Sequence, residues 1–181
     1  MKMFKFVVPW LLLFCAPLLA EETGGSMEVY VDLGDVVAGN KVTPVEGVTS
    51  AGQPDEEALK VFADSGYVAV IDLRGDNENR GFDEAAVVES LGMKYISLPI
   101  DSPAAMSFAN AEKLDALINS ADGPVLVHCG SGNRVGALLA LRKKLGGASD
   151  EEALEHGRDG GMTSAEPLIR QRLQESAGNA E

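Results

Sequence analysis

The sequence is poor in cysteine, in histidine and in basic residues. It has two cysteines and two histidines, and neither type sits in a cluster with the spacing of a metal site, so we expect no metal and no cofactor. It also lacks internal repeats and low-complexity tracts. Its 181 residues, 45% hydrophobic and 24% charged, are ordinary for a globular protein and allow one domain with a hydrophobic core.

The only long apolar run lies within residues 1–20. Lys2 and Lys5 precede the stretch FVVPWLLLFCAPLLA, which is short for a membrane span, and Ala20 offers a small residue before EETGG. This pattern predicts a signal peptide over residues 1–20 and a periplasmic or secreted protein. The alternative is an uncleaved N-terminal anchor.

Basic residues are scarce in the predicted mature chain. Without Lys2 and Lys5, the 28 acidic residues leave a formal net charge of −15. Such a surface repels polyanions, so we expect no nucleic-acid partner and no stable membrane association after signal removal.

Loss of Cys15 with the signal leaves Cys129 as the only thiol, which excludes an intramolecular disulfide. An exposed thiol without a function is a liability in an oxidising compartment. The two interpretations of Cys129 are a buried small hydrophobe and a reactive group.

Apolar, β-branched segments alternate with amphipathic ones along the chain. This alternation predicts an α/β fold with a largely parallel central sheet flanked by helices. Strands are expected over residues 45–52, 67–74, 94–100 and 123–129. Helices are expected over residues 55–66, 82–92, 107–121 and 134–147, and two more begin near Ser149 and Glu166.

We therefore expect a domain over residues 45–177, followed by a tail at 178–181. Residues 21–44 precede it as an N-terminal arm, in which MEVYVDLGDVV is either a short strand or an ordered extension.

The segment VLVHCGSGNR ends an apolar strand and opens a helix. Gly130 and Gly132 allow backbone conformations that turn successive N–H groups inward around an anion. The following helix directs its N-terminal amides to the same place, and Arg134 adds a fork that grips two oxyanion oxygens. A helix N-terminus and an arginine also favour the thiolate form of Cys129. The loop therefore suits a nucleophile that attacks an anion. His128 either orients the strand end or is a hydrogen-bonded core histidine.

The segments TSAGQP, VIDLR, YISLPID and VLVHCGSGNR, in this order, make residues 47–172 resemble the dual-specificity and tyrosine phosphatase superfamily. Within it, the chain is most similar to the bacterial phosphatase-like domain related to beta-lactamase hydrolase-like proteins. The resemblance implies a cysteine phosphatase-type fold, a phosphorylated substrate and a cysteinyl-phosphate intermediate. It implies that Cys129 is the nucleophile, Arg134 the phosphate clamp and Asp101 the general acid.

Two features depart from the common phosphatase pattern. Only four residues separate Cys129 from Arg134, namely Gly130, Ser131, Gly132 and Asn133, where five are usual. Val135 stands where serine or threonine usually steadies the leaving thiolate, a role that Ser131 is a candidate to fill. Short loops also occur in rhodanese-like sulfurtransferases, so a persulfide on Cys129 is one alternative. A non-catalytic domain that binds phosphorylated or sulfated ligands is another.

The remaining polar positions carry weaker signals. Asp72 and Arg74 are expected to be structural. Gln53 lies at a strand end on the expected active side. Residues 77–84, NENRGFDE, are expected to form a solvated loop.

Overall fold

The computed structural model describes residues 27–44 and 47–178. The predicted signal peptide and residues 179–181 of the predicted tail lie outside the described residues. No helix in the described part of the chain is both long and apolar enough to cross a membrane.

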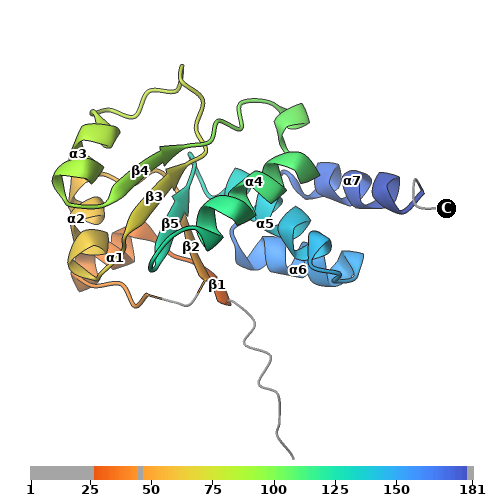
Figure 1. The fold of residues 1–181 in the computed structure, drawn as a ribbon, viewed down its shortest axis with the longest axis horizontal. Coiled ribbons are helices and arrows are strands. Elements are labelled where there is room, and N and C mark those ends of the chain that lie inside the picture. Colours follow the sequence, from red (N-terminus) through yellow and green to blue (C-terminus); the bar gives the residue numbers. More distant parts are fainter. Residues whose placement is uncertain (1–26, 45–46, 179–181) are drawn as a thin grey trace, which may run out of the picture.

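Five parallel strands form one sheet in the order β1-β2-β5-β3-β4, which confirms the predicted fold class (Figure 1). The order places β5 at the centre, with β2 and β3 as its neighbours. The strands are β1 Met27–Tyr30, β2 Gly47–Ala51, β3 Ala69–Asp72, β4 Lys94–Ser97 and β5 Val125–His128.

Helices cover both faces of the sheet (Figure 1). One layer consists of α1 Leu33–Gly39, α2 Glu56–Asp64 and α3 Glu84–Ser90. The other consists of α4 Phe108–Asn119, α5 Asn133–Leu145, α6 Asp150–Asp159 and α7 Glu166–Gly178. A short 3-10 helix, η1 Pro103–Ala105, precedes α4.

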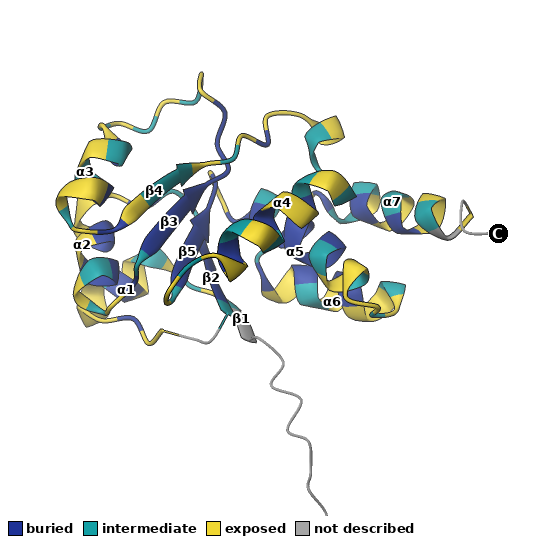
Figure 2. Ribbon diagram, viewed as in Figure 1, coloured by how far each residue is buried: buried dark blue, intermediate teal, exposed yellow. Residues whose placement is uncertain are grey.

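Alternate side chains of the buried strands supply the two halves of the core. In β3, Val70 packs with Leu59 and Phe62 of α2, whereas the next residue, Ile71, packs with Leu114 of α4. Strand residues point to opposite faces in turn, so a strand covered on both sides is largely apolar, and polar residues in it need partners, as Asp72 and His128 have. Figure 2 shows this as central strands that are buried along their length.

Side-chain caps fix several helix starts. The Ser149 hydroxyl accepts a hydrogen bond from the Glu152 amide, and the Glu152 carboxylate accepts one from the Ser149 amide. This capping box is the one predicted from the sequence, and α6 follows it. The Asp55 carboxylate caps α2 by accepting from the Ala58 amide at 2.8 Å. Each cap of this kind typically stabilises a helix by about 1 kcal/mol.

The N-terminal segment joins the sheet from Met27 onward. Of the two interpretations of MEVYVDLGDVV, the structure has the strand, because β1 pairs in parallel with β2. α1 follows it, with Asp32 as its N-cap. The described part of the expected arm is therefore an edge strand and a helix of the same fold.

α5 and α6 cross at closely packed glycines. A Cβ atom added to Gly136 would lie 2.3 Å from the Gly157 carbonyl oxygen and 2.3 Å from the Met162 amide nitrogen. Backbone atoms cannot give way as a flexible side chain does. Glycine at position 136 therefore sets how closely the two helices approach.

We expect Gly136→Ala to lower the free energy of unfolding by about 1–3 kcal/mol or more, because the added methyl group overpacks this crossing. Gly39→Ala is the matched control, since a Cβ atom there meets nothing within 4 Å. That variant should keep its stability or gain up to about 1 kcal/mol from helix propensity. Urea unfolding measures both, and equal stability of the two variants would contradict the close crossing.

Candidate active site

Cys129 directly follows β5, the central strand, at its carboxyl end and is 1% exposed. The loop after it is held against the end of β2. The Cys129 amide donates to the Ala51 carbonyl at 3.4 Å, Gly52 forms a bridge with Ser131, and the Gln53 amide donates to the Gly130 carbonyl at 3.4 Å. These backbone contacts give the loop a fixed path from strand to helix.

The loop ends at Gly132, which is the N-cap of α5 and has a φ of 82°. No side chain caps this helix, unlike the helices opened by Asp55 and Ser149. The amides of its first turn have no partner within the helix, and the positive end of the helix dipole lies here. The turn after Cys129 therefore offers backbone N–H donors that no side chain of the helix caps.

Arg134 lies in the first turn of α5 and its guanidinium turns back toward the strand ends. It donates to the Ile100 carbonyl at 3.1 Å and makes a two-point contact with Glu78, at 2.6 and 2.8 Å. The hydrogen bond to Glu78 raises the pKa of Arg134, whereas burial lowers it. Charge attraction to Cys129 and to Glu78 and a hydrogen bond to Cys129 raise this pKa further. The structure thus places Arg134 close enough to Cys129 for the two side chains to interact.

Glu78 is a residue that sequence reasoning missed. Besides Arg134, its carboxylate accepts from the Gly75 amide at 2.8 Å and from Arg74 Nε at 3.2 Å. The hydrogen bond from Arg134 is the main reason why its pKa falls from 4.5 to about 2. The expectation of a solvated loop over residues 77–84 is wrong here, because the loop folds inward onto two arginines.

We expect the Glu78 contact to make stability depend on pH in one direction. A carboxyl group with a lowered pKa in the folded state stabilises above its unfolded pKa, and this contribution disappears as the pH falls through the folded value. The gap in unfolding free energy between wild type and Glu78→Gln should stay constant above about pH 5 and close between about pH 4.5 and about pH 2. Urea unfolding across this range measures it. Glu89→Gln, at an exposed position in α3, is the control, and a gap independent of pH would contradict the ionic contact.

Asp101 follows the buried Ile100, whose carbonyl accepts from Arg134. A Cβ atom added to Gly75 would lie 3.1 Å from the Asp101 Cβ atom, so a side chain at position 75 would crowd Asp101. Asp101 is exposed, and Ser102 caps the short helix η1 just after it. The structure therefore places Asp101 one residue from a contact of Arg134, at the open edge of the site.

His128 is fully buried beneath the loop. Its Nε2 lies 2.8 Å from Glu84 Oε1 and 3.7 Å from Asp72 Oδ1. Gln53 donates to the other oxygen of Glu84 at 2.9 Å and also bonds to Arg74. The end of β5 that precedes Cys129 thus rests on a connected polar cluster, in which Gln53 and Glu84 join Asp72 and Arg74.

The carboxylates of this cluster already have a cation. Arg80 lies 2.6 Å from Asp72 and 3.8 Å from Glu84, and the Tyr95 hydroxyl donates to Asp72 at 2.8 Å. Burial is the main reason why the pKa of Tyr95 is raised. Although Asp72, Glu84 and His128 offer donor atoms within 4.8 Å of one another, Arg80 supplies the compensating charge. The arrangement fits a structural support beneath the loop better than a metal centre.

The side chain of Asn133 faces away from the loop interior. Its Oδ1 accepts from the amides of Thr163 and Ala165, at 2.8 and 3.1 Å, and its Nδ2 donates to the Ser164 hydroxyl at 3.1 Å. Asn133 therefore ties the start of α5 to the segment before α7. Any contact of this residue with an anion must come from its backbone amide.

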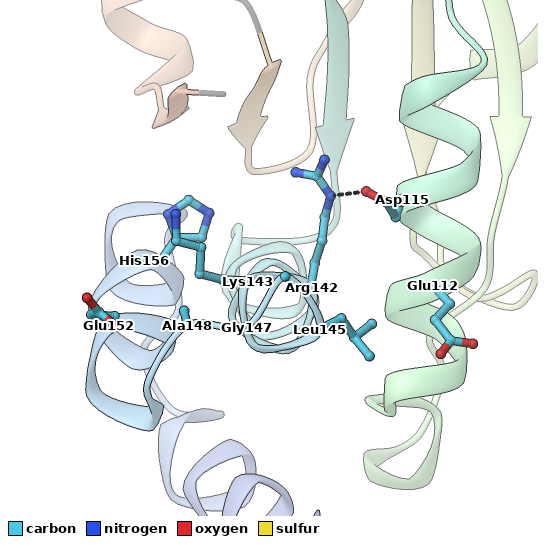
Figure 3. A pocket seen from close by; sticks show the side chains of 10 residues that line it. Glu112, Asp115, Arg142, Lys143, Leu145, Gly147, Ala148, Glu152 and His156 are labelled. Atoms are coloured by element: carbon cyan, nitrogen blue, oxygen red, sulfur yellow. Dashed lines mark hydrogen bonds and ion pairs between the residues drawn. The ribbon is translucent and has the colours of Figure 1, made fainter. Parts of the chain in front are cut away.

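A groove of about 920 Å³ lies at the far end of α5 (Figure 3). Arg142, which contacts Asp115 at 2.7 Å, and His156 are among the residues that line it. α5 has 13 residues, so its two ends are about 20 Å apart. The groove is therefore separate from the loop that holds Cys129.

Comparisons with known proteins agree with this geometry. The family model described as a DSP-PTPase phosphatase fused to NAD+ kinase matches residues 41–173. The beta-lactamase hydrolase-like protein of Xylella fastidiosa is 32% identical over 138 residues, which are 71% of this chain and 32% of that protein. The protein of that name from Agrobacterium fabrum is 28% identical over 123 residues, 63% of this chain and 28% of its own length. The chain thus spans about a third of the curated relatives it matches.

Solved structures share the fold at low sequence identity. A Neisseria meningitidis structure described as a phosphatase has a TM-score of 0.61 at 22% identity, covering 71% of this chain and 92% of the other. Kinase associated phosphatase, with its catalytic-site cysteine replaced by serine, has a TM-score of 0.55 at 15% identity, covering 74% and 85%. P. aeruginosa TpbA in complex with phosphotyrosine has a TM-score of 0.53 at 18% identity, covering 80% and 86%.

The match to the family model covers well over half of the chain and includes the Cys129–Arg134 loop. The chain belongs to the DSP-PTPase family and so to the dual-specificity and tyrosine phosphatase superfamily.

Proposed function

We propose that the protein is a cysteine-dependent phosphoester hydrolase that acts through a cysteinyl-phosphate intermediate. The observation that carries the proposal is the meeting of Cys129 and Arg134 at an uncapped helix N-terminus. The bound phosphotyrosine in the structural neighbour TpbA supports a phosphoester as the kind of ligand.

In the first step, the Cys129 thiolate attacks phosphorus and forms the P–S bond, while the P–O bond to the leaving group breaks. The leaving oxygen takes the electron pair of that bond and a proton from Asp101. Arg134 and the amides of the loop hold the other three phosphoryl oxygens. Charge on these oxygens is the main thing the site must stabilise in phosphoryl transfer.

In the second step, water attacks phosphorus and the P–S bond breaks. The Asp101 carboxylate accepts a proton from the water, inorganic phosphate leaves, and the Cys129 thiolate is restored. Val135 is buried and has no hydroxyl to offer this thiolate, whereas Ser131 is exposed in the loop. We propose that the loop amides and Arg134 stabilise the departing sulfur.

The experiment is an assay of aryl phosphate hydrolysis without added metal. We expect turnover that vanadate inhibits, and we expect Cys129→Ser to abolish turnover while phosphate binding remains. Mass spectrometry of Cys129 after exposure to phosphoester and, separately, to thiosulfate distinguishes a phosphoryl adduct from a persulfide. Thiosulfate:cyanide transfer without phosphatase activity at any pH would refute the proposal in favour of a sulfurtransferase. Anion binding with neither activity would favour a non-catalytic binding domain.

We also propose that the protein acts outside the cytoplasm, on the basis of the basic and apolar pattern of residues 1–20. Fractionation of cells that express the full chain tests this, together with N-terminal sequencing of the purified product. Export with cleavage after Ala20 is expected, and an intact N-terminus in the cytoplasmic fraction would refute it.

A further inference from the structure

Tyr30 ends the edge strand β1, at the same end of the sheet as Cys129. It pairs in register with Ser50, and the next amide, that of Val31, donates to the Ser50 carbonyl at 2.9 Å. All five strands are parallel, so the carboxyl ends of β1 and β5 lie at one edge of the sheet. The segment before the family match thus delivers an aromatic ring to the active side.

The ring of Tyr30 touches the candidate loop directly. A Cβ atom added to Gly132 would lie 2.4 Å from the Cε2 atom of the ring, and one added to Gly161 would lie 2.6 Å from its Cδ2 atom. Both glycines have positive φ angles, 82° and 95°. The edge of the ring therefore occupies a slot between the N-cap of α5 and the turn after α6, and neither wall of this slot tolerates a side chain.

Despite these contacts, Tyr30 stays 40% exposed. Among the described residues, Tyr30 and Leu145 are the exposed large hydrophobic residues, and Leu145 ends α5 far from the loop. Tyr30 therefore combines an exposed aromatic surface with a fixed position beside the anion site. This combination is typical of residues that contact a ligand.

We propose that Tyr30 forms one wall of the substrate site and favours phosphomonoesters whose leaving group carries an aromatic ring. The inference rests on the proposed function. Asp101 follows β4 and Tyr30 ends β1, and these are the two edge strands on opposite sides of β5. A leaving group above Cys129 is thus flanked by the proposed acid on one side and by an aromatic ring on the other. Offset or edge-to-face packing of two rings corresponds to a gain in affinity of about two- to tenfold.

The first experiment measures binding, which does not depend on turnover. Isothermal titration of the full protein compares benzylphosphonate with methylphosphonate, two ligands that share the anion and differ in the ring. We expect Tyr30→Ala to weaken benzylphosphonate by about two- to tenfold and methylphosphonate by less than about twofold. Tyr30→Phe should keep the wild-type preference. Leu145→Ala, at the other exposed large hydrophobic residue, should leave both affinities unchanged.

A purely structural role for Tyr30 predicts a different pattern. If the ring only braces Gly132, Tyr30→Ala should weaken the binding of both phosphonates equally, and that result would overturn the proposal. An unchanged affinity of Tyr30→Ala for both ligands would also overturn it. So would a wild-type protein that binds neither ligand. Tyr30→Leu, which keeps apolar bulk in the slot without an aromatic face, should also lose the preference and serves if the alanine variant does not fold.

Kinetics separate this inference from the proposed function. For an active enzyme, Tyr30→Ala should raise KM for aryl phosphates with little change in kcat, and should leave alkyl phosphates unaffected. A wild-type protein that hydrolyses no ester but binds benzylphosphonate through Tyr30 would refute the hydrolase and keep the aromatic wall. If wild type hydrolyses esters and Tyr30→Ala keeps the preference for aryl esters, the hydrolase stands and the aromatic wall is refuted.

Discussion

Replacing Arg134 with lysine should lower kcat/KM by about 10²–10³-fold or more, although the positive charge is kept. Lysine has no planar fork, so it cannot grip two phosphoryl oxygens at once. It also cannot keep both the two-point contact with Glu78 and the hydrogen bond to the Ile100 carbonyl that hold the group in place. Loss of one preorganised donor for a developing oxyanion typically costs about this factor. Steady-state kinetics with an aryl phosphate measures the effect.

Arg142→Lys is the matched control for this prediction, because it makes the same substitution in the same helix at the end far from Cys129. Its turnover should equal that of wild type. Thermal unfolding of both variants shows whether either has lost the fold. Near-normal turnover of Arg134→Lys would show that Arg134 does not clamp the phosphate.

Asp101→Asn should slow poor leaving groups by about 10²–10⁴-fold, the usual contribution of a positioned general acid. A nitrophenolate leaves with little help, whereas the alkoxide of a serine or a sugar needs a proton as the P–O bond breaks. The loss should therefore grow as the leaving group becomes more basic.

A series of aryl and alkyl phosphates of graded leaving-group basicity tests this expectation. Asp122→Asn is the control, because Asp122 is an exposed acid in the turn that enters β5 at its other end. An equal loss across the series, or none, would assign Asp101 to ordinary turn chemistry after the β4 strand. The general acid would then have to be another group.

The sequence was sufficient for the sheet and for the loop because both depend on local patterns. A strand buried on two faces is mostly apolar, so 123–129 could be recognised without its neighbours, and β5 occupies residues 125–128. The glycines and Arg134 likewise carry their conformational and charge properties within six residues of Cys129. The capping box at Ser149 is equally local, since both partners lie within one helical turn.

The support of the site could not be predicted, because it depends on contacts between distant residues. Glu78 meets Arg134 across 56 positions, and nothing in NENRGFDE distinguishes an inward carboxylate from a solvated one. Charged residues have no periodicity that shows which way they face. The same holds for Arg80, which neutralises Asp72 beneath His128.

Tyr30 was missed for a different reason. A four-residue edge strand pairs on one side only, so its sequence carries little signal. The residues around β1 fitted an ordered extension as well as a strand. The slot that receives its ring is built by Gly132 and Gly161, which lie about one hundred positions or more further along the chain. Only the folded arrangement shows that these three residues share a contact.

The strand order of the sheet has a consequence for how this protein can evolve. Cys129 and the proposed phosphate loop follow the central strand β5, whereas Tyr30 ends the edge strand β1 and Asp101 follows the edge strand β4. Edge strands have a single neighbour each, so changes in them disturb fewer contacts than changes in β5. If the proposed roles hold, substitutions at the two margins of the sheet should change which ester is accepted while leaving the proposed transfer site at its centre intact.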